Sequence, residues 1–166
     1  MPARKTLRKL VLFYSNTGGT RYIAQTIANT VGADVAEIKT LKPVSTFMPW
    51  LSFWGGFQVM TRHKPKIQPL LKKPETYDLI YIGTPIWASR FAPALRTWLT
   101  KVGHKGKRLA LFASGSGGKP GRTFTELRAA LPDNTYSVDL IVQNPLKDKT
   151  ASARLARDWA RQVLKG

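Results

Sequence analysis

The chain contains no cysteine. This absence excludes disulfide bonds, zinc–thiolate sites, iron–sulfur clusters and a cysteine nucleophile, so any redox chemistry has to reside in a bound cofactor. Histidine is scarce as well, and the two histidines, His63 and His104, have no carboxylate or second histidine at ligand spacing. We therefore expect no metal site and assign neither histidine a catalytic role.

Long hydrophobic runs are also missing. The most apolar stretch, residues 47–60, is interrupted by Pro49, Gly55 and Gly56, and it falls short of the roughly 18 apolar residues that a membrane-spanning helix requires. The basic amino terminus precedes an apolar run of residues 10–14, which is too short for a signal peptide and lacks a small-residue cleavage site. We expect a cytoplasmic protein without a transmembrane helix.

Acidic residues are few. The chain has 9 Asp and Glu against 27 Lys and Arg, which gives a formal net charge of +18 and a pI near 10.7. Its 166 residues suit one domain spanning residues 1–166, over which the cations are spread without a long uninterrupted run. Such a surface attracts anionic partners.

Apolar runs alternate with helical stripes along the chain. The runs that we expect to be strands cover residues 10–14, 34–38, 79–83, 108–113 and 136–142. Apolar residues at helical spacing lie between and after them: Ile23, Ile27 and Val31; Leu95, Trp98, Leu99 and Val102; Phe124, Leu127 and Leu131; Leu155, Trp159 and Val163. This alternation predicts an α/β fold with a doubly wound parallel sheet. Because ligands of such sheets bind beyond the carboxyl ends of the strands, the loops after the first, third and fourth strands are the candidate sites.

The loop after the first expected strand reads SNTGGT, residues 15–20. Ser15, Thr17 and Thr20 offer hydroxyl donors, while Gly18 and Gly19 let the backbone curl so that amide hydrogens point inward where a helix begins. Such neutral donors can surround a terminal phosphate monoester, and the loop lacks the lysine and the longer spacing of an ATP-binding P-loop. An ordinary turn is the alternative, but the position between strand and helix favours phosphate.

Two further loops have residues suited to a planar ligand. In GTPIWASRF, residues 83–91, Pro85 stiffens the exit of the strand and Trp87 can stack on a cofactor, although a core or helix-capping role is the alternative for this tryptophan. In SGSGG, residues 114–118, the glycines let backbone groups approach the edge of a heterocycle, whereas a flexible linker is the plainer alternative. Both loops follow apolar strands, which favours ligand contact.

Taken in order, SNTGGT, YDLIYIGTPIW and LFASGSGG resemble the flavodoxin family, and the resemblance covers nearly the whole chain. It implies a short-chain, FMN-binding member whose fold is a three-layer α/β/α sandwich with a five-stranded parallel sheet of flavodoxin-like order 2-1-3-4-5. In such a protein the flavin performs the redox step, and the protein orients and tunes it.

By position, the resemblance implies three groups of FMN contacts. The phosphate would be held by Ser15, Asn16, Thr17, Gly18, Gly19 and Thr20. The ring system would be contacted by Thr84, Pro85, Ile86, Trp87 and Ala88. The other edge of the ring would be bordered by Ser114, Gly115, Ser116, Gly117 and Gly118.

Two departures from the family leave the activity open. The loop after the fourth strand has no aromatic or acidic residue, so the outer face of the ring would be open, and the chain is basic where familiar flavodoxins are acidic. We expect an electron-transfer protein whose redox partner has an acidic docking surface. The alternative is an NAD(P)H-dependent FMN oxidoreductase or quinone reductase. A basic module that binds nucleic acid or membrane is a third hypothesis, with no specific nucleic acid expected.

The segment between the second and third strands, residues 43–69, is longer than a minimal helical crossover. It holds Trp50, Phe53, Trp54 and Phe57, followed by Arg62, His63, Lys64 and Lys66. One interpretation is a helix with a lid over the flavin or a docking surface, and another is peripheral membrane contact through residues 47–66. The third is a buried crossover helix, because aromatic residues at this spacing usually pack in a core.

Overall fold

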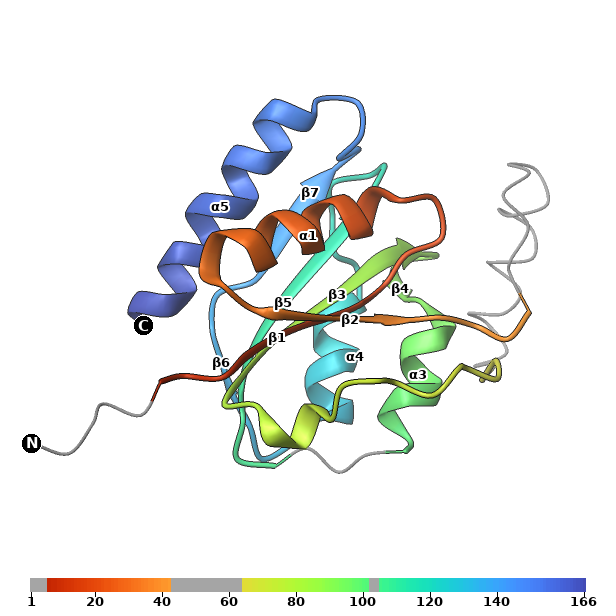
Figure 1. Cartoon of the computed structure of the whole chain (residues 1–166). Coiled ribbons are helices and arrows are strands. Elements are labelled where there is room, and N and C mark those ends of the chain that lie inside the picture. The colour runs from red at the N-terminus through yellow and green to blue at the C-terminus, as the bar shows by residue number, and fades with distance from the viewer. Residues whose placement is uncertain (1–5, 43–63, 102–104) are drawn as a thin grey trace, which may run out of the picture.

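A computed structural model of the chain describes residues 6–42, 64–101 and 105–166 (Figure 1). The four aromatic residues between positions 50 and 57, His63 and His104 lie outside these ranges, as does Val102 of one expected helical stripe, so the interpretations that rest on them stay predictions. No helix in the described part of the chain is long and apolar enough to cross a membrane.

The first strand–helix–strand unit consists of β1 (Lys9–Tyr14), α1 (Gly19–Val31) and β2 (Asp34–Ile38). β1 is buried on both faces from its second residue onward, as expected of a strand inside a parallel sheet. Gly32, with φ 61°, ends α1 in the left-handed conformation, and its N–H donates to the carbonyl of Ala28. The sequence pattern of this unit is confirmed.

The rest of the chain continues the alternation around the same sheet. Its elements are η1 (Pro74–Thr76), β3 (Leu79–Trp87), β4 (Arg90–Phe91), α3 (Pro93–Leu99), β5 (Arg108–Gly115), α4 (Thr123–Ala130), β6 (Thr135–Tyr136), β7 (Leu140–Gln143) and α5 (Lys149–Lys165). Helices α1 and α5 lie side by side on one face of the sheet, and α3 and α4 cover the other (Figure 1). The expected α/β architecture with helices on both faces is confirmed.

The sheet itself differs from the expected five-stranded one. It has seven strands, with β2-β1-β3-β5-β6 in order, β7 also paired with β5, and β4 paired antiparallel with β3. The expected fifth strand, residues 136–142, is divided into β6 and β7, which pair with the two halves of β5. Between them, residues 137–139 face only residues 110 and 111 of β5, so one extra residue bulges out and interrupts the ladder.

Polar contacts from both helical layers hold this bulge. From α5, the indole Nε1 of Trp159 donates to the carbonyl of Val138 at 2.7 Å. From α4, Nη2 of Arg128 donates to Oδ1 of Asp139 at 2.7 Å. The alternation of apolar residues shows neither contact, which is why the sequence pattern predicted one continuous strand.

The second difference lies at the end of β3, where residues 84–87 were expected in a loop. They continue the strand, and the change of pairing falls at Pro85: up to this residue β3 pairs with β5, and from Ile86 it pairs with β4. Proline has no N–H to donate to a ladder, so it marks the point where β3 leaves the main sheet. The loop expected at residues 83–91 is therefore a strand end followed by a hairpin.

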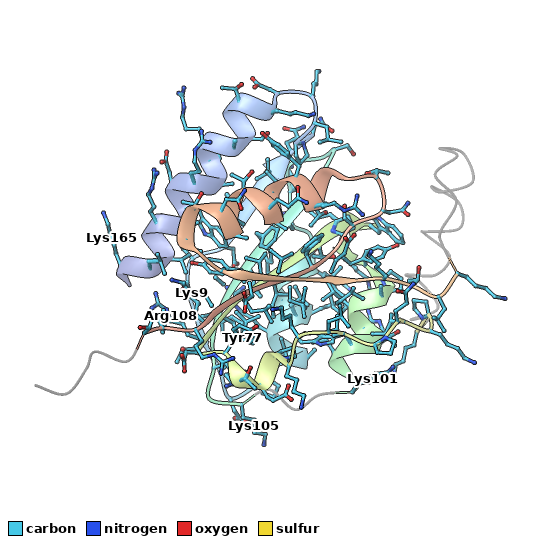
Figure 2. All side chains as sticks on the ribbon, in the orientation of Figure 1. Lys9, Tyr77, Lys101, Lys105, Arg108 and Lys165 are labelled. Carbon is cyan, nitrogen blue, oxygen red and sulfur yellow. The ribbon has the colours of Figure 1, made fainter. Side chains whose placement is uncertain are left out.

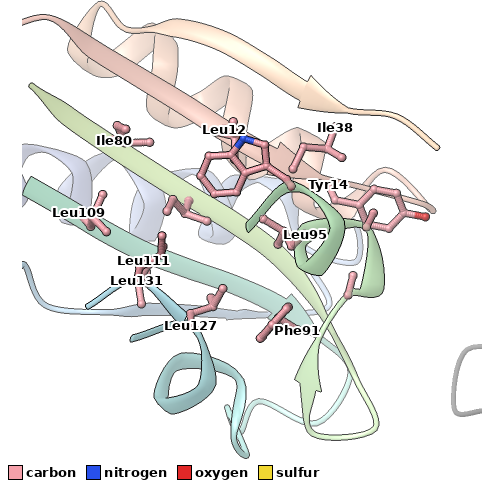
Figure 3. Close-up of a cluster of buried hydrophobic side chains, with 14 of the residues drawn as sticks. Leu12, Tyr14, Ile38, Ile80, Phe91, Leu95, Leu109, Leu111, Leu127 and Leu131 are labelled. Carbon is pink, nitrogen blue, oxygen red and sulfur yellow. The ribbon is translucent and has the colours of Figure 1, made fainter. Parts of the chain in front are cut away.

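Two apolar clusters fix the helices on the sheet. On one face, aliphatic side chains of the strands meet Leu95 of α3 and Leu127 of α4 (Figure 3). On the other, Trp159 packs edge-on against Tyr81 and Phe112, with ring centroids 5.6 and 6.1 Å apart. A Cβ on the neighbouring Gly83 would overlap the Phe112 ring, so glycine is required in this central strand.

Helix α5 buries Trp159 and Val163 as expected, but Leu155 is not part of the buried face. Leu155 is 53% exposed, whereas Ala156, Trp159, Ala160 and Val163 are buried. The expectation followed the largest apolar side chains, but the small alanines allow α5 to lie close to α1, and Leu155 stands about 100° around the helix from Ala156. The buried stripe therefore combines the large Trp159 and Val163 with the alanines that allow close approach, in place of Leu155.

Candidate cofactor-binding cleft

An open cleft of about 510 Å³ lies beyond the carboxyl ends of the parallel strands. This volume is within the roughly 300–1,000 Å³ that is usual for small-molecule sites. Four segments line it, one at the carboxyl end of each of β1, β3, β5 and β7. They contribute Ser15, Asn16, Thr17, Gly19 and Thr20; Pro85, Ile86 and Trp87; Ser114, Gly115 and Ser116; and Asn144, Pro145, Leu146 and Lys147.

The loop at residues 15–20, which we call the phosphate loop, is fixed by its own polar groups. Gly18, with φ 96°, turns the chain into α1, and the hydroxyl Oγ of Ser15 accepts from the backbone N–H of Arg21 at 3.2 Å. The buried hydroxyls of Thr20 and Ser114 are 2.8 Å apart and join the loop to β5. The N–H groups of Arg21 and Tyr22 are thus used within the protein. Gly19 and Thr20, the first residues of α1, line the cleft, where the first amides of a helix have no partner within the helix.

One buried donor in this loop has no partner. The side-chain nitrogen Nδ2 of Asn16 is inaccessible to solvent and makes no hydrogen bond to any described residue. Leaving a buried donor unpaired costs about 1–3 kcal/mol. Asn16 lines the cleft, so a rotation of its amide toward a ligand with acceptor oxygens, such as a phosphate or a carbonyl, would supply the missing partner.

Arg21, the first residue after the phosphate loop, is already paired with a carboxylate of the protein. The guanidinium of Arg21 donates from Nε to both carboxylate oxygens of Glu37, at 3.2 and 3.3 Å, and from Nη2 to Oε1 at 2.5 Å. This hydrogen bonding to Glu37 is the main cause that raises the pKa of Arg21. The pair is close to electrically neutral, so the phosphate loop offers uncharged donors.

At the other end of the cleft, the hairpin of β3 and β4 carries Trp87. Its two turn residues, Ala88 and Ser89, have φ values of 47° and 62°, a conformation that L-residues other than glycine adopt at a cost. The carbonyl of Ser89 accepts from the N–H of Arg122 at 2.7 Å. Gly121, itself at φ +54°, leaves room for the turn, since a Cβ there would overlap Ser89 and lie 2.6 Å from its carbonyl oxygen.

Tyr14 lies between the two ends of the cleft. Its ring meets that of Trp87 edge-on, with centroids 6.0 Å apart and planes at 83°. Burial, and to a smaller extent the charge of Glu37, raises the pKa of Tyr14 to about 12. The phenol is therefore protonated at any physiological pH and serves as a neutral support for Trp87.

Eleven of the sixteen residues predicted to contact the cofactor line the cleft. The other five are Gly18, Thr84, Ala88, Gly117 and Gly118. Thr84 is fully buried, where its hydroxyl donates to the carbonyl of Pro85 and accepts from the N–H of Ala92, both at 2.9 Å, so it supports the hairpin. Ala88 is exposed at the tip of the turn. The assignment of all sixteen to FMN stays a prediction.

The sequence reasoning missed the loop at residues 144–147. Asn144, with φ 44°, donates its N–H to the carbonyl of Gly115 at 2.9 Å and accepts from the N–H of Lys147 at 2.9 Å. Pro145 lies against the phosphate loop, where a Cβ on Gly19 would be 3.5 Å from its Cγ. An Asn–Pro pair after the last strand is a turn signal, and the rule of carboxyl strand ends applies to that strand as well.

The doubly wound sheet, with a cleft at the carboxyl strand ends that combines a Ser/Thr/Gly loop with apolar side chains, is the arrangement of an α/β protein with a small-molecule site. The chain belongs to the flavodoxin family, whose model matches residues 8–159. None of the curated proteins matches the chain by sequence.

Three solved structures show how widely this fold is shared. A presumed flavoprotein from Bacteroides uniformis has a TM-score of 0.80 at 22% identity, with 93% of this chain and 98% of that chain covered. A flavoprotein from Lactobacillus acidophilus, solved in complex with FMN, has a TM-score of 0.68 at 22% identity, covering 87% and 99%. A flavodoxin from Streptococcus pneumoniae has a TM-score of 0.57 at 13% identity, covering 95% and 97%. At these identities the likeness concerns the fold.

Proposed function

We propose that this flavodoxin-family protein binds FMN in the cleft and carries electrons between a reductase and an acceptor protein. The observation that carries the proposal is the phosphate loop, which combines uncharged donors with the unpaired Nδ2 of Asn16 just before the N-terminus of α1. The family membership and the FMN bound to the Lactobacillus acidophilus flavoprotein support the choice of cofactor. The cytoplasmic location expected from the sequence stays a prediction.

The residues around the cleft have separate roles in this proposal. Residues 15–20 hold the phosphate, residues 85–87 lie against the ring system, and residues 114–116 border its other edge. The bound flavin would supply the redox chemistry, and the protein supplies position and electrostatics. Because Trp87 is packed against the buried Tyr14, it provides a fixed surface for the ring.

The charge around the cleft supports a partner with an acidic docking surface. The nearby carboxylates are taken up within the protein: Glu37 binds Arg21, Glu126 binds Arg90 at 3.0 Å, and Asp148 accepts from the N–H of Ala151 at 2.9 Å. Because these carboxylates already have partners within the protein, the remaining lysines and arginines give the surface a net positive charge that attracts an acidic partner.

Positive charge is not confined to the cleft. Three cations lie at the opposite end of the molecule from the cleft, where the parallel strands begin: Lys9, Arg108 and Lys165 (Figure 2). A field spread in this way accelerates encounter with an acidic partner from many directions, and it does not by itself select one face of the molecule. Docking over the cleft follows from the position of the flavin.

One observation favours the second candidate, an NAD(P)H-dependent FMN oxidoreductase or quinone reductase. The loop after β5 begins with Ser116, Gly117 and Gly118 and has no aromatic residue, and a Cβ on Gly117 would meet no atom within 4 Å. A loop without bulky side chains beside Ser116, which lines the cleft, would let a second planar ring lie on the flavin, as hydride transfer from a nicotinamide requires.

Turnover assays separate the two candidates. The FMN-loaded protein is mixed with NADPH and a benzoquinone, with and without a catalytic amount of an NADPH-dependent flavodoxin reductase, and NADPH oxidation is followed at 340 nm. The carrier proposal predicts turnover only with the reductase. Rapid NADPH oxidation without reductase would establish the oxidoreductase instead. Salt-sensitive binding to unrelated DNA or anionic vesicles would be generic for such a charge and would support neither.

A further inference from the structure

The phosphate of FMN brings more negative charge than the phosphate loop is built to balance. A phosphate monoester has its second pKa near 6 and carries about −1.5 to −2 charges near pH 7. The loop offers neutral hydroxyls and amides, and the guanidinium of Arg21 is bound by the carboxylate of Glu37. A counter-charge from another segment would complete the site.

Lys147 is placed to supply it. This lysine lines the same cleft, in the loop at residues 144–147 that packs on the phosphate loop. A Cβ on Gly18 would be 3.9 Å from Cδ1 of Leu146, and one on Gly19 would be 3.5 Å from Cγ of Pro145. The segment that carries Lys147 therefore touches the glycines at which the phosphate would sit.

The charge of Lys147 is not consumed by the neighbouring acid. Asp148 caps α5, with its Oδ1 accepting from the N–H of Ala151 at 2.9 Å. Within the described ranges, no carboxylate lies within ion-pair distance of the Lys147 ammonium. The backbone of Lys147 is held by its N–H bond to Asn144, so the side chain starts from a fixed point on the rim of the cleft.

We infer that Lys147 is the counter-charge of the FMN phosphate and that it makes the cleft select FMN over riboflavin, which has the same ring system and no phosphate. This inference rests on the proposed binding of FMN. It assigns a positioning and specificity role to a residue in the loop after β7, a loop that the motifs of the sequence did not single out.

Equilibrium titration of the apoprotein with FMN and, separately, with riboflavin tests the inference by quenching of flavin fluorescence. The variants are Lys147→Met, which removes the charge and keeps most of the length, and Lys147→Arg, which restores the charge. Lys149→Met is the matched control, because the Lys149 ammonium lies 5.8 Å from the centroid of the Tyr22 ring and does not line the cleft.

At low ionic strength we expect Lys147→Met to weaken FMN binding about five- to tenfold and to leave riboflavin binding within about twofold of wild type. Lys147→Arg and Lys149→Met should both bind FMN within about twofold of wild type. The weakening caused by Lys147→Met should shrink in 0.5 M salt, because salt screens an exposed ion pair.

Two results would overturn the inference while leaving FMN binding itself intact: equal loss of FMN and riboflavin affinity, or equal loss in the Lys147→Met and Lys149→Met variants. The first would mean that Lys147 shapes the cleft, and the second that only overall charge matters. If the wild-type protein bound neither flavin, the proposed function would fail before the question of Lys147 arose.

Discussion

The two ends of the cleft are built in different ways. At the phosphate end, residues 15–20 keep their shape through Gly18 and through hydroxyl contacts such as that between Thr20 and Ser114. At the ring end, shape depends on the strained turn at Ala88 and Ser89 and on its contact with a segment more than thirty positions along the chain. The phosphate end is therefore fixed by polar contacts of a loop whose residues mark it in the sequence, and the ring end by the steric fit of a strained turn against a distant segment.

Substitution of Gly121 should have the largest effect, because it acts on that fit. In Gly121→Ala the new methyl group would overlap Ser89, and the alanine backbone would have to keep a positive φ. The turn must therefore move. We expect the free energy of unfolding to fall by about 2–3 kcal/mol and FMN affinity to fall with it. Thermal and urea unfolding and FMN titration measure the two effects.

Gly117→Ala is the matched control in the same loop. A Cβ there meets nothing within 4 Å, and the backbone of Gly117 is not in the left-handed region. It should unfold like the wild type. If both variants were equally stable, the hairpin would not depend on the fit between Ser89 and Gly121.

At the phosphate end, Thr20→Val should have the next largest effect. The valine keeps the shape of the threonine but removes the hydroxyl that contacts Ser114, so a buried hydroxyl loses its partner. The expected loss is about 1–2 kcal/mol in the free energy of unfolding, measured by urea denaturation. The double variant Thr20→Val/Ser114→Ala should be no less stable than Thr20→Val alone, since both polar groups are then gone. A double variant with the summed loss of both singles would contradict this pairing.

Asn16→Ala should separate affinity from stability. Because Nδ2 of Asn16 is buried with no partner among the described residues, its removal should leave the apoprotein no less stable than wild type and should raise the free energy of unfolding by up to about 1–3 kcal/mol. FMN affinity should fall about tenfold, equivalent to about 1.4 kcal/mol. The opposite pattern, a less stable apoprotein that binds FMN normally, would assign Asn16 to the fold and not to the cofactor.

The smallest effect at neutral pH concerns Tyr14, between the two ends. Its pKa is raised to about 12 in the folded protein, above its ordinary value of 10.0. Above pH 10 the unfolded chain therefore loses the phenolic proton while the folded protein keeps it, so stability falls as pH rises from 10 towards 12. In urea denaturation from pH 10 to 12, the free energy of unfolding of Tyr14→Phe should fall less steeply with pH than that of wild type. Near pH 7 the two proteins should show the same dependence of this free energy on pH. Identical slopes at high pH would show that the phenol is not buried.

The same contrast explains what the sequence could predict. The phosphate loop was predicted because its hydroxyl and glycine residues stand together between a strand and a helix. The hairpin was not, because Ala88 and Ser89 are not the residues that turns with positive φ normally use. Trp87 was expected in the cleft, but the support that Tyr14 gives it comes from a strand more than seventy positions earlier.

Long-range contacts also account for the errors in the fold. The division of the fifth strand depends on Trp159 and Arg128, which hold the bulge from two different helices. The exposure of Leu155 follows from the close packing of α5 on α1 through alanines. Periodicity reports which residues of one element are apolar, and it contains no information on how closely a second element approaches.

The most direct test of the account is a titration of the purified protein with FMN, followed by flavin absorbance and fluorescence. Binding of one FMN per chain, with a perturbed flavin spectrum and quenched fluorescence, is the result that the cleft and its phosphate loop predict. An unchanged spectrum and undiminished fluorescence at a large excess of protein would contradict the central claim that this cleft is a flavin site.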